Sequence, residues 1–352
     1  MSTFSWLHVS DLHLDGREVN THRAAIDLML HDIRESRARP GWTADNRTLS
    51  PDAVFFTGDV ASTGKRREYV GARSQFGDLL RACGLDGRWD RLFIVPGNHD
   101  ADRDVVAKPD HALRQTKRRA EDLLNENTPY DEVNQWLSDP DCRDFKKFAH
   151  FSRFISGLVS DPDWRFERTR HCAVTGMDID GHAVVVMGFN SALLSFKDLE
   201  QGQLLLGEGQ VCDAIDRGRT RWPTARLRIA LMHHPLYWLA EKDLHEVQPH
   251  LHRNCDMLLR GHLHCSSLTV QSTPDYYVRE MGAGASMHRP YCSYNLTRVC
   301  LESGHVQVKV RIRQQGITGN WGNDTVTYPR DCPNGWMEFD LPLHNGWALQ
   351  EA

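Results

Sequence analysis

Short, mostly apolar runs alternate with amphipathic stretches at the start of the chain. Phe4–Val9, Asp52–Thr57 and Arg91–Val95 have the length and the β-branched and aromatic content of buried strands. Thr21–Arg37 and Arg66–Ala82, which lie between them, space their apolar residues as amphipathic helices do. Strands and helices in alternation predict an α/β fold with a mainly parallel sheet at this end of the chain.

The pattern changes after the third predicted strand. Residues 102–163 contain charged, helix-favouring segments such as His111–Asn125 and Cys142–Val159. An insertion at this point would lie near the ends of the strands. Two interpretations are open: a helical cap over a site at the strand ends, or a solvated helical decoration.

Strand character returns in the second half of the chain. Arg165–Gly176 and Ala183–Asn190 flank Asp178–Gly181, and an Asp-Gly pair between two β-rich runs is a hairpin signal. Arg226–Met232 and Asp256–Arg260 are two further candidates for buried strands. Each of the last two ends at a polar motif, as the first three predicted strands do.

The last hundred residues predict a different arrangement. Tyr276–Met281, Tyr294–Leu301 and His305–Ile312 favour a closing antiparallel meander. Residues 316–352 are rich in Gly, Pro, Asn and Trp and have weak periodicity. We expect them to form a small C-terminal extension at the edge of a sheet.

Asp, Asn and His residues lie at the ends of five of the apolar runs. These residues are found in Asp11-Leu-His13, Gly58-Asp59, Gly97-Asn98-His99-Asp100, His233-His234-Pro235 and Gly261-His262-Leu-His264. Asp, Asn and His without Cys form the donor set that hard to borderline divalent metals prefer. The pattern predicts a two-metal hydrolase whose ligands lie at strand ends.

The same ordered segments resemble the calcineurin-like metallophosphoesterase superfamily, whose pattern is D-x-H, G-D, G-N-H-D or G-N-H-E, H, and G-H-x-H. The resemblance implies a four-layer αββα sandwich, in which two β-sheets pack face to face with helices on both outer sides. We therefore expect a metallophosphoesterase domain over residues 1–315, a helical insertion at about 102–163 and an extension over 316–352.

The resemblance also implies two divalent metal ions, which could be manganese, iron or zinc. It assigns the first metal to Asp11, His13, Asp59 and His264, and the second metal to Asp59, Asn98, His233 and His262. Either His of the pair at 233 and 234 could face a metal, and the family pattern favours His233. Residues two apart in an extended segment point the same way, so His262 and His264 could reach both metals.

Four further residues are candidates for contact with the substrate. In the family, the position of His99 contacts the phosphoryl group and acts as general acid, and Asp100 would orient and charge this imidazole. Arg17 and Arg103 lie where they could hold a substrate phosphate. Asn190, at the end of a predicted strand, could support a metal ligand or form a turn, and we favour the turn.

Local motif details distinguish the branches of the superfamily. The protein serine/threonine phosphatase branch has Arg-Gly soon after G-D and ends its G-N-H motif in Glu, whereas here Val60 follows Asp59 and the motif ends in Asp100. The chain is more similar to the bacterial branch of cyclic-nucleotide and other small phosphodiesterases. That similarity implies hydrolysis of a small phosphodiester by in-line attack of a metal-bound hydroxide.

Two other functions stay open at this point. A nuclease that acts on DNA or RNA shares the same metal motifs, but the net charge of −5 gives no general attraction to a polyanion. A non-catalytic scaffold for a protein partner usually loses ligands, and this chain keeps all of them.

Composition predicts the compartment. The chain has 352 residues, of which 40% are hydrophobic and 25% charged, as in an ordinary soluble globular protein. The N-terminus runs directly into the first ligand motif, and no apolar run is long enough to cross a membrane. Nine Cys without a C-x-x-C pair favour reduced thiols. We therefore expect a cytoplasmic protein without a membrane partner.

Overall fold

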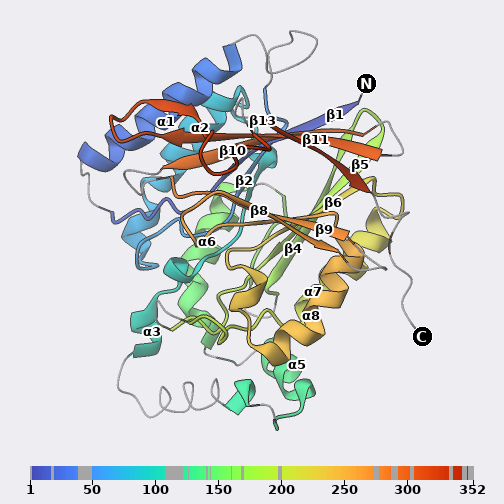
Figure 1. The fold of residues 1–352 in the computed structure, drawn as a ribbon. Helices are drawn as coiled ribbons and strands as arrows, with labels where there is room; N and C mark the ends of the chain where they lie inside the picture. Colours follow the sequence, from blue (N-terminus) through green and yellow to red (C-terminus); the bar gives the residue numbers. More distant parts are fainter. Residues whose placement is uncertain are drawn as a thin grey trace.

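Two β-sheets packed face to face form the centre of the computed structural model (Figure 1). The structure describes residues 2–16, 20–38, 50–107, 122–125, 127–139, 142, 144–159, 161–167, 170–196, 200–272, 277–286, 292–301, 305–332, 336–342 and 347. Within these ranges, the first sheet has seven strands in the order β12-β11-β10-β1-β2-β3, with β13 also paired to β11, and the second has six in the order β4-β5-β6-β7-β9-β8.

The strand bounds show how each sheet is built from separate parts of the chain. The first sheet contains β1 (Thr3–Val9), β2 (Ala53–Phe56), β3 (Leu92–Ile94), β10 (Ser293–Cys300), β11 (His305–Gln315), β12 (Trp321–Asn323) and β13 (Trp336–Pro342). The second contains β4 (Cys172–Ile179), β5 (His182–Phe189), β6 (Leu227–Leu231), β7 (Met257–Arg260), β8 (Ser267–Ser272) and β9 (Tyr277–Gly282).

The strands that precede the polar motifs are parallel within their sheets. β1, β2 and β3 run parallel to one another, as the alternation of strands and helices predicts. In the second sheet, β5, β6 and β7 are also parallel. Because parallel strands end at the same edge, the motifs after β1, β2 and β3 meet there, and those after β6 and β7 meet in the facing sheet.

Aromatic side chains fill the space between the two sheets. Trp6, Phe55 and Phe93, on adjacent strands, form a row with ring centroids 5.7 Å and 5.6 Å apart, and Trp164 continues it at 5.0 Å from Phe93. The indole N–H of Trp164 donates to the backbone oxygen of Ile94 at 3.2 Å. Each fully buried side chain of this size contributes about 1.5–3 kcal/mol through the hydrophobic effect. This core supports the strand ends that carry the motifs.

Helices cover the outer faces of both sheets (Figure 1). α1 (Asn20–Ala38) and α2 (Ala72–Cys83) pack on the first sheet, where their apolar residues meet Val9 and Phe56. α7 (Glu208–Arg221) and α8 (Glu241–Asn254) pack on the second sheet. The four layers confirm the αββα fold that the motifs imply. No helix among the described residues is long and apolar enough to cross a membrane.

The region predicted as an insertion is helical where the structure describes it. It contains α3 (Arg103–Ala107), α5 (Tyr130–Ser138), the 3-10 helix η4 (Asp144–Phe148) and α6 (Ala149–Leu158). Most of the predicted helix over His111–Asn125 lies outside the described residues. Buried Lys147 anchors η4, because its ammonium donates to the backbone oxygens of Leu193 at 2.7 Å and Ser195 at 3.0 Å.

Short 3-10 helices complete the described secondary structure. They are η1 (Arg66–Tyr69), η2 (Trp89–Arg91), η3 (Asn98–Asp100) and η5 (Leu236–Trp238). Two of them, η3 and η5, begin at or just after a polar motif. These tight turns change the direction of the chain where it leaves the sheet edge.

The closing part of the chain differs from the predicted meander. β10 and β11 are antiparallel neighbours, as expected, but β9 belongs to the second sheet, where it is parallel to β7 and antiparallel to β8. The prediction was wrong because consecutive β-rich runs do not reveal which sheet each of them joins. β12 and β13 both pair with β11, so segments from residues 316–352 extend the first sheet.

The hairpin signal in the second sheet is confirmed. β4 and β5 are antiparallel and are joined by Asp180 and Gly181, whose φ angles are 51° and 85°. Positive φ at both central residues is the geometry of a two-residue type I′ turn. The N–H of Gly181 also donates to Oδ1 of Asp178 at 3.0 Å.

Candidate metal centre

Most of the candidate ligands have an unusual backbone conformation. Among the described residues, six non-glycine residues have positive φ, and five of them are candidate ligands: Asp11 (56°), His13 (46°), Asp59 (59°), His262 (71°) and His264 (54°). The expectation that His262 and His264 lie in an extended segment is therefore wrong. Backbone of this kind concentrates at functional sites, because the surrounding structure must hold it in place.

Two motif glycines allow the loops to approach one another closely. A Cβ atom on Gly97 would collide with the carboxylate of Asp59, and one on Gly261 would collide with the Ser10 hydroxyl and come within 2.9 Å of Oδ2 of Asp11. Only glycine has no side chain to clash at these points. The loops can therefore bring donors from separate strands together.

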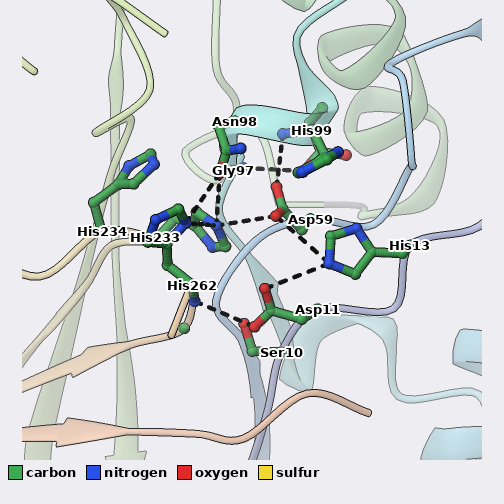
Figure 2. Close-up of polar contacts among 12 residues, drawn as sticks. Ser10, Asp11, His13, Asp59, Gly97, Asn98, His99, His233, His234 and His262 are labelled. Carbon is green, nitrogen blue, oxygen red and sulfur yellow. Dashed lines mark hydrogen bonds and ion pairs between the residues drawn. The ribbon is translucent and has the colours of Figure 1, made fainter. Parts of the chain in front are cut away.

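One group of donors gathers around Asp11. Nε2 of His264 lies 3.2 Å from Oδ1 of Asp11, and Nε2 of His13 lies 3.7 Å from the same oxygen. The two imidazole nitrogens are 3.3 Å apart. Nε2 of His13 is also 3.8 Å from Oδ2 of Asp59 (Figure 2). Four side chains from the loops after β1, β2 and β7 therefore face a common point.

A second group gathers around Asn98. Nε2 of His233 lies 3.1 Å from Oδ1 of Asn98 and 3.1 Å from Oδ2 of Asp59. Nδ1 of His262 lies 3.2 Å from the Asn98 oxygen and 3.3 Å from Nε2 of His233 (Figure 2). This group combines the loops after β2, β3, β6 and β7, and so joins the two sheets.

Asp59 belongs to both groups. Its Oδ1 accepts a hydrogen bond from the backbone N–H of His99 at 2.8 Å, and its Oδ2 faces both His13 and His233. The side chain is nearly inaccessible to solvent, with 2% exposed. A carboxylate held in this way can place one oxygen between two cations.

The donor geometry fits metal ions. Ligand atoms bound to one ion at about 2.0–2.2 Å lie about 3 Å from one another, which is close to the separations of 3.1–3.3 Å in the second group. Oδ1 of Asp11 is buried and accepts no aligned hydrogen bond, although imidazole nitrogens surround it. The residues lie in the two groups that the resemblance assigns to two metals; binding of the ions stays a prediction.

Backbone carbonyl groups orient two of the imidazoles. Nδ1 of His233 lies 2.6 Å from the oxygen of Thr57, and Nδ1 of His99 lies 2.7 Å from the oxygen of Ser62. A carbonyl oxygen can only accept, so each Nδ1 carries the proton. In His233 this leaves Nε2 to face Asp59 as a metal donor, which is the arrangement common among metal-bound histidines.

His234 has a different set of neighbours. Its Nδ1 lies 2.9 Å from Oγ of Ser191, which also accepts hydrogen bonds from the backbone N–H groups of His233 and His234. The His234 ring stacks with Trp238 and lies 4.5 Å from the ring of His262. A donor atom of His234 also lies within 4.8 Å of donors on His233 and His262. His233, not His234, contacts Asp59.

The structure corrects the role expected for Asp100. Its carboxylate accepts four hydrogen bonds, from the backbone N–H groups of Val60 (3.2 Å), Ala61 (3.0 Å) and Gly97 (3.0 Å) and from the hydroxyl of Tyr69 (2.9 Å). The buried carboxylate thereby connects the loop after β2 with the loop after β3. The atom facing Nδ1 of His99 is the carbonyl oxygen of Ser62, so a backbone group and not the Asp100 carboxylate orients the imidazole at this nitrogen.

Burial and neighbouring charges shift the pKa values of four groups in and beside the centre. Burial disfavours charge on both Asp59 and His233, but their mutual attraction outweighs it, so the pKa of Asp59 lies well below its usual range and that of His233 rises to about 9. Burial and the charge of His233 lower the pKa of His262 to about 3. Burial and the charge of Asp59 raise the pKa of Asp100 to about 6, despite its hydrogen bonds.

Three other residues were singled out from the sequence: Arg17, Arg103 and Asn190. Arg17 lies outside the described residues. Arg103 is half-buried at the start of α3, and its charge acts on Lys147 of η4. Asn190 is a turn former, as expected, because its Oδ1 accepts the N–H of Ala192 at 3.0 Å.

The sequence reasoning missed Ser191 and Ser62, which contact His234 and His99. A signal for Ser191 existed, since it follows the end of strand β5, which is parallel to β6. Ser62 acts through its backbone oxygen, and such a contact has no signature in residue type.

Comparison with known proteins gives a consistent picture. A family model described as calcineurin-like phosphoesterase matches residues 4–266. The uncharacterized metallophosphoesterase-like protein YydB of Bacillus subtilis (strain 168) is 24% identical over 324 residues, which are 86% of this chain and 58% of that protein. The chain thus spans little more than half the length of this curated relative.

Solved structures with a similar arrangement are distant. A 5'-nucleotidase precursor from Thermus thermophilus has a TM-score of 0.40 and 14% identity, over 85% of this chain and 51% of that one. A conserved uncharacterized protein from Streptococcus pneumoniae TIGR4, titled a predicted phosphoesterase, has a TM-score of 0.30 and 12% identity, over 97% and 99%. At these scores neither likeness bears on the chemistry of the site. The match over residues 4–266 shows that the chain belongs to the calcineurin-like phosphoesterase family.

Proposed function

We propose that this protein is a metal-dependent phosphoester hydrolase, and more narrowly a phosphodiesterase that acts on a cyclic nucleotide or another small phosphodiester. The observation that carries the proposal is the position of Asp59, whose Oδ2 faces His13 in one donor group and His233 in the other. Family membership supports the reaction class. The oxygen and imidazole donors suit manganese, iron or zinc.

The donor groups support a two-metal site. When bound, two cations would neutralise the phosphoryl oxygens and lower the pKa of an attacking water. Asp11, His13 and His264 would hold one cation, Asn98, His233 and His262 the other, and Asp59 both. The protein would supply the rigid positions of these donors.

His99 is our candidate for the proton donor to the leaving oxygen. Its ring lies edge-on to that of His13, with centroids 4.7 Å apart, so it borders the first donor group. The carbonyl oxygen of Ser62 fixes the proton on Nδ1 and makes Nε2 the atom that would exchange a proton with the substrate. Asp100 would act indirectly, by positioning the loops that carry Asp59 and His99.

The exposure of the donors suggests the side from which a substrate approaches. The side chains of His13 and His264 are 21% and 31% exposed, whereas those of His233 and Asp59 are 0% and 2% exposed. A phosphodiester would therefore reach the first donor group from solvent. The net charge of −5 favours a small substrate over a nucleic acid polymer.

Hydrolysis of bis(p-nitrophenyl) phosphate tests the reaction class. We expect turnover with added manganese and none after chelation. Asp59→Ala should remove both metal occupancy and turnover, because the carboxylate belongs to both donor groups. His99→Ala should keep the metals and lose rate. Loss of the metals in His99→Ala would contradict the role of His99, and turnover that survives complete chelation would contradict the metal mechanism.

A parallel assay on cyclic nucleotides, single-stranded DNA and RNA tests the substrate class. Hydrolysis of cyclic nucleotides or of other small diesters supports the proposal. Activity on the polymers alone would replace it with a nuclease. Absence of activity on every substrate, in protein shown to contain two metals, would favour a non-catalytic scaffold.

A further inference from the structure

A second cluster of metal donors lies on the two helices that cover the second sheet. Glu208 and Cys212 are four residues apart on α7, so their side chains project from the same face of that helix. His250 projects from α8, which packs beside α7 (Figure 1). Nε2 of His250 lies 3.3 Å from Oε1 of Glu208, and the donor atoms of all three residues lie within 4.8 Å of one another.

We propose that Glu208, Cys212 and His250 bind a zinc ion that connects α7 to α8. Thiolate, imidazole and carboxylate are the donors that zinc accepts in proteins, and three such donors with a water form a common tetrahedral set. All three residues are partly exposed, so an ion can reach them from solvent. This donor set differs from the candidate metal centre, whose predicted ligands include no sulfur.

The backbone around the cluster is held firmly, so the donors need little rearrangement. The buried carboxylate of Asp243, near the start of α8, accepts hydrogen bonds from the backbone N–H groups of Leu206 at 2.6 Å and Gly207 at 3.0 Å, just before α7. The N–H of Glu208 donates to the hydroxyl of Tyr130 at 2.9 Å, and that hydroxyl donates to Asp243 at 2.6 Å. The start of each helix is thereby fixed to the other.

An ion pair between Glu208 and His250 is the simpler explanation of the same contact, but it assigns no part to Cys212. Burial and then the charges of Glu208 and Asp216 raise the pKa of the Cys212 thiol to about 11. Nearby carboxylates disfavour the charged thiolate form of Cys212 until a cation neutralises their charge. The cluster thus has the negative field that attracts a divalent ion as well as the donors that select zinc.

The site would stabilise the part of the fold next to the candidate metal centre. α8 begins at Glu241, soon after the segment that carries His233, and the two helices cover strands β6 and β7, which end in ligand motifs. A bound zinc would connect α7 and α8 from the outside. It would contact none of the residues proposed to bind substrate.

Cobalt absorption spectroscopy on the full-length protein tests the proposal, because only a thiolate ligand gives the near-ultraviolet charge-transfer band of cobalt(II). We expect wild type to develop this band, zinc to abolish it, and Cys212→Ser to lack it. Cys265→Ser is the matched control, since Cys265 is exposed and adjacent to His264, and it should keep the band. His250→Ala should weaken cobalt binding at this site by at least about tenfold, in line with the loss of a metal ligand.

Thiol alkylation of wild type provides a second measurement that needs no variant. Zinc should slow modification of Cys212, located by peptide mass. The proposal is overturned if wild type shows no thiolate band, if the band survives Cys212→Ser, or if zinc leaves alkylation of Cys212 unchanged. A band that disappears only in Cys265→Ser would assign the thiolate to the other metal centre and equally overturn it.

Discussion

Replacing Asp100 by alanine removes the acceptor of four hydrogen bonds at the edge of the first sheet. Three of the donors are buried backbone N–H groups, and the fourth is the Tyr69 hydroxyl. A buried donor left without an acceptor costs about 1–3 kcal/mol, so the three backbone groups together would cost about 3–9 kcal/mol. Water that enters the space of the lost carboxylate would satisfy part of them. We therefore expect Asp100→Ala to lower the free energy of unfolding by about 3–6 kcal/mol.

Urea denaturation in the presence of a chelator measures this change without a contribution from bound metal. The same variant should also hold less manganese, because Asp59 and Asn98 lie on the two loops that Asp100 connects. Asp104→Ala is the matched control: its carboxylate is 76% exposed and pairs with Lys65 at 2.6 Å. A change at such a surface ion pair should stay within about 0.5 kcal/mol.

The result separates the two roles considered for Asp100. A proton-transfer partner of His99 would be needed for rate and not for folding. If Asp100→Ala unfolded at the urea concentration of wild type, kept its metals and lost only turnover, the structural role assigned to these hydrogen bonds would be refuted.

Three further predictions follow from the core and the metal centre. Gly97→Ala should lose metal occupancy, because its Cβ would collide with the carboxylate of Asp59. Gly157→Ala is the control and should bind metal as wild type does, because a Cβ there meets nothing within 4 Å. Equal metal occupancy in the two variants would contradict this account. The raised pKa of His233, about 9, means that its proton stabilises the metal-free fold below pH 6.5 and that this contribution is lost as the pH rises through 9. A cation must displace the same proton, so manganese affinity measured by calorimetry should rise with pH up to about 9; affinity that falls over this range would refute the assignment. Phe55→Ala should lower the free energy of unfolding by about 3–5 kcal/mol in urea denaturation, because it opens a cavity between the sheets, and a loss below about 1 kcal/mol would be inconsistent with that position.

The positions of the candidate ligands were predictable from the sequence for a simple physical reason. An apolar run that is buried on both faces must end where the chain leaves the sheet, and parallel strands leave it at one edge. Asp59 after β2 and Asn98 after β3 therefore had to lie near Asp11 after β1. The residue types after the strands were therefore enough to predict one common site, whereas the division of the ligands between two metals came from the resemblance.

Contacts that depend on backbone geometry were not predictable in this way. Asp100 has the residue type of a proton-transfer partner, yet its carboxylate accepts N–H groups of Val60 and Ala61, about forty positions earlier in the chain. Which sheet β9 joins depends on the path of the chain after His264, and strand propensity carries no information about that path. The resemblance sorted His262 and His264 onto two metals, but the extended backbone expected between them does not occur.

The left-handed conformation of five ligands has a cost in folding free energy that the rest of the fold must offset. Each such residue costs about 1–2 kcal/mol, so five of them together oppose folding by about 5–10 kcal/mol. Asp11 and Asp59 add two buried carboxylates to that cost. These terms are comparable with the whole stability of a typical domain, and the aromatic row between the sheets and the helices on both outer faces must compensate for them. In the second donor group the donor atoms lie about 3 Å apart on backbone that this core holds in place, so metal binding would require little further ordering of the chain. The strained backbone at Asp11, Asp59 and His262 positions the donor atoms, and the packing of the core keeps it in that conformation.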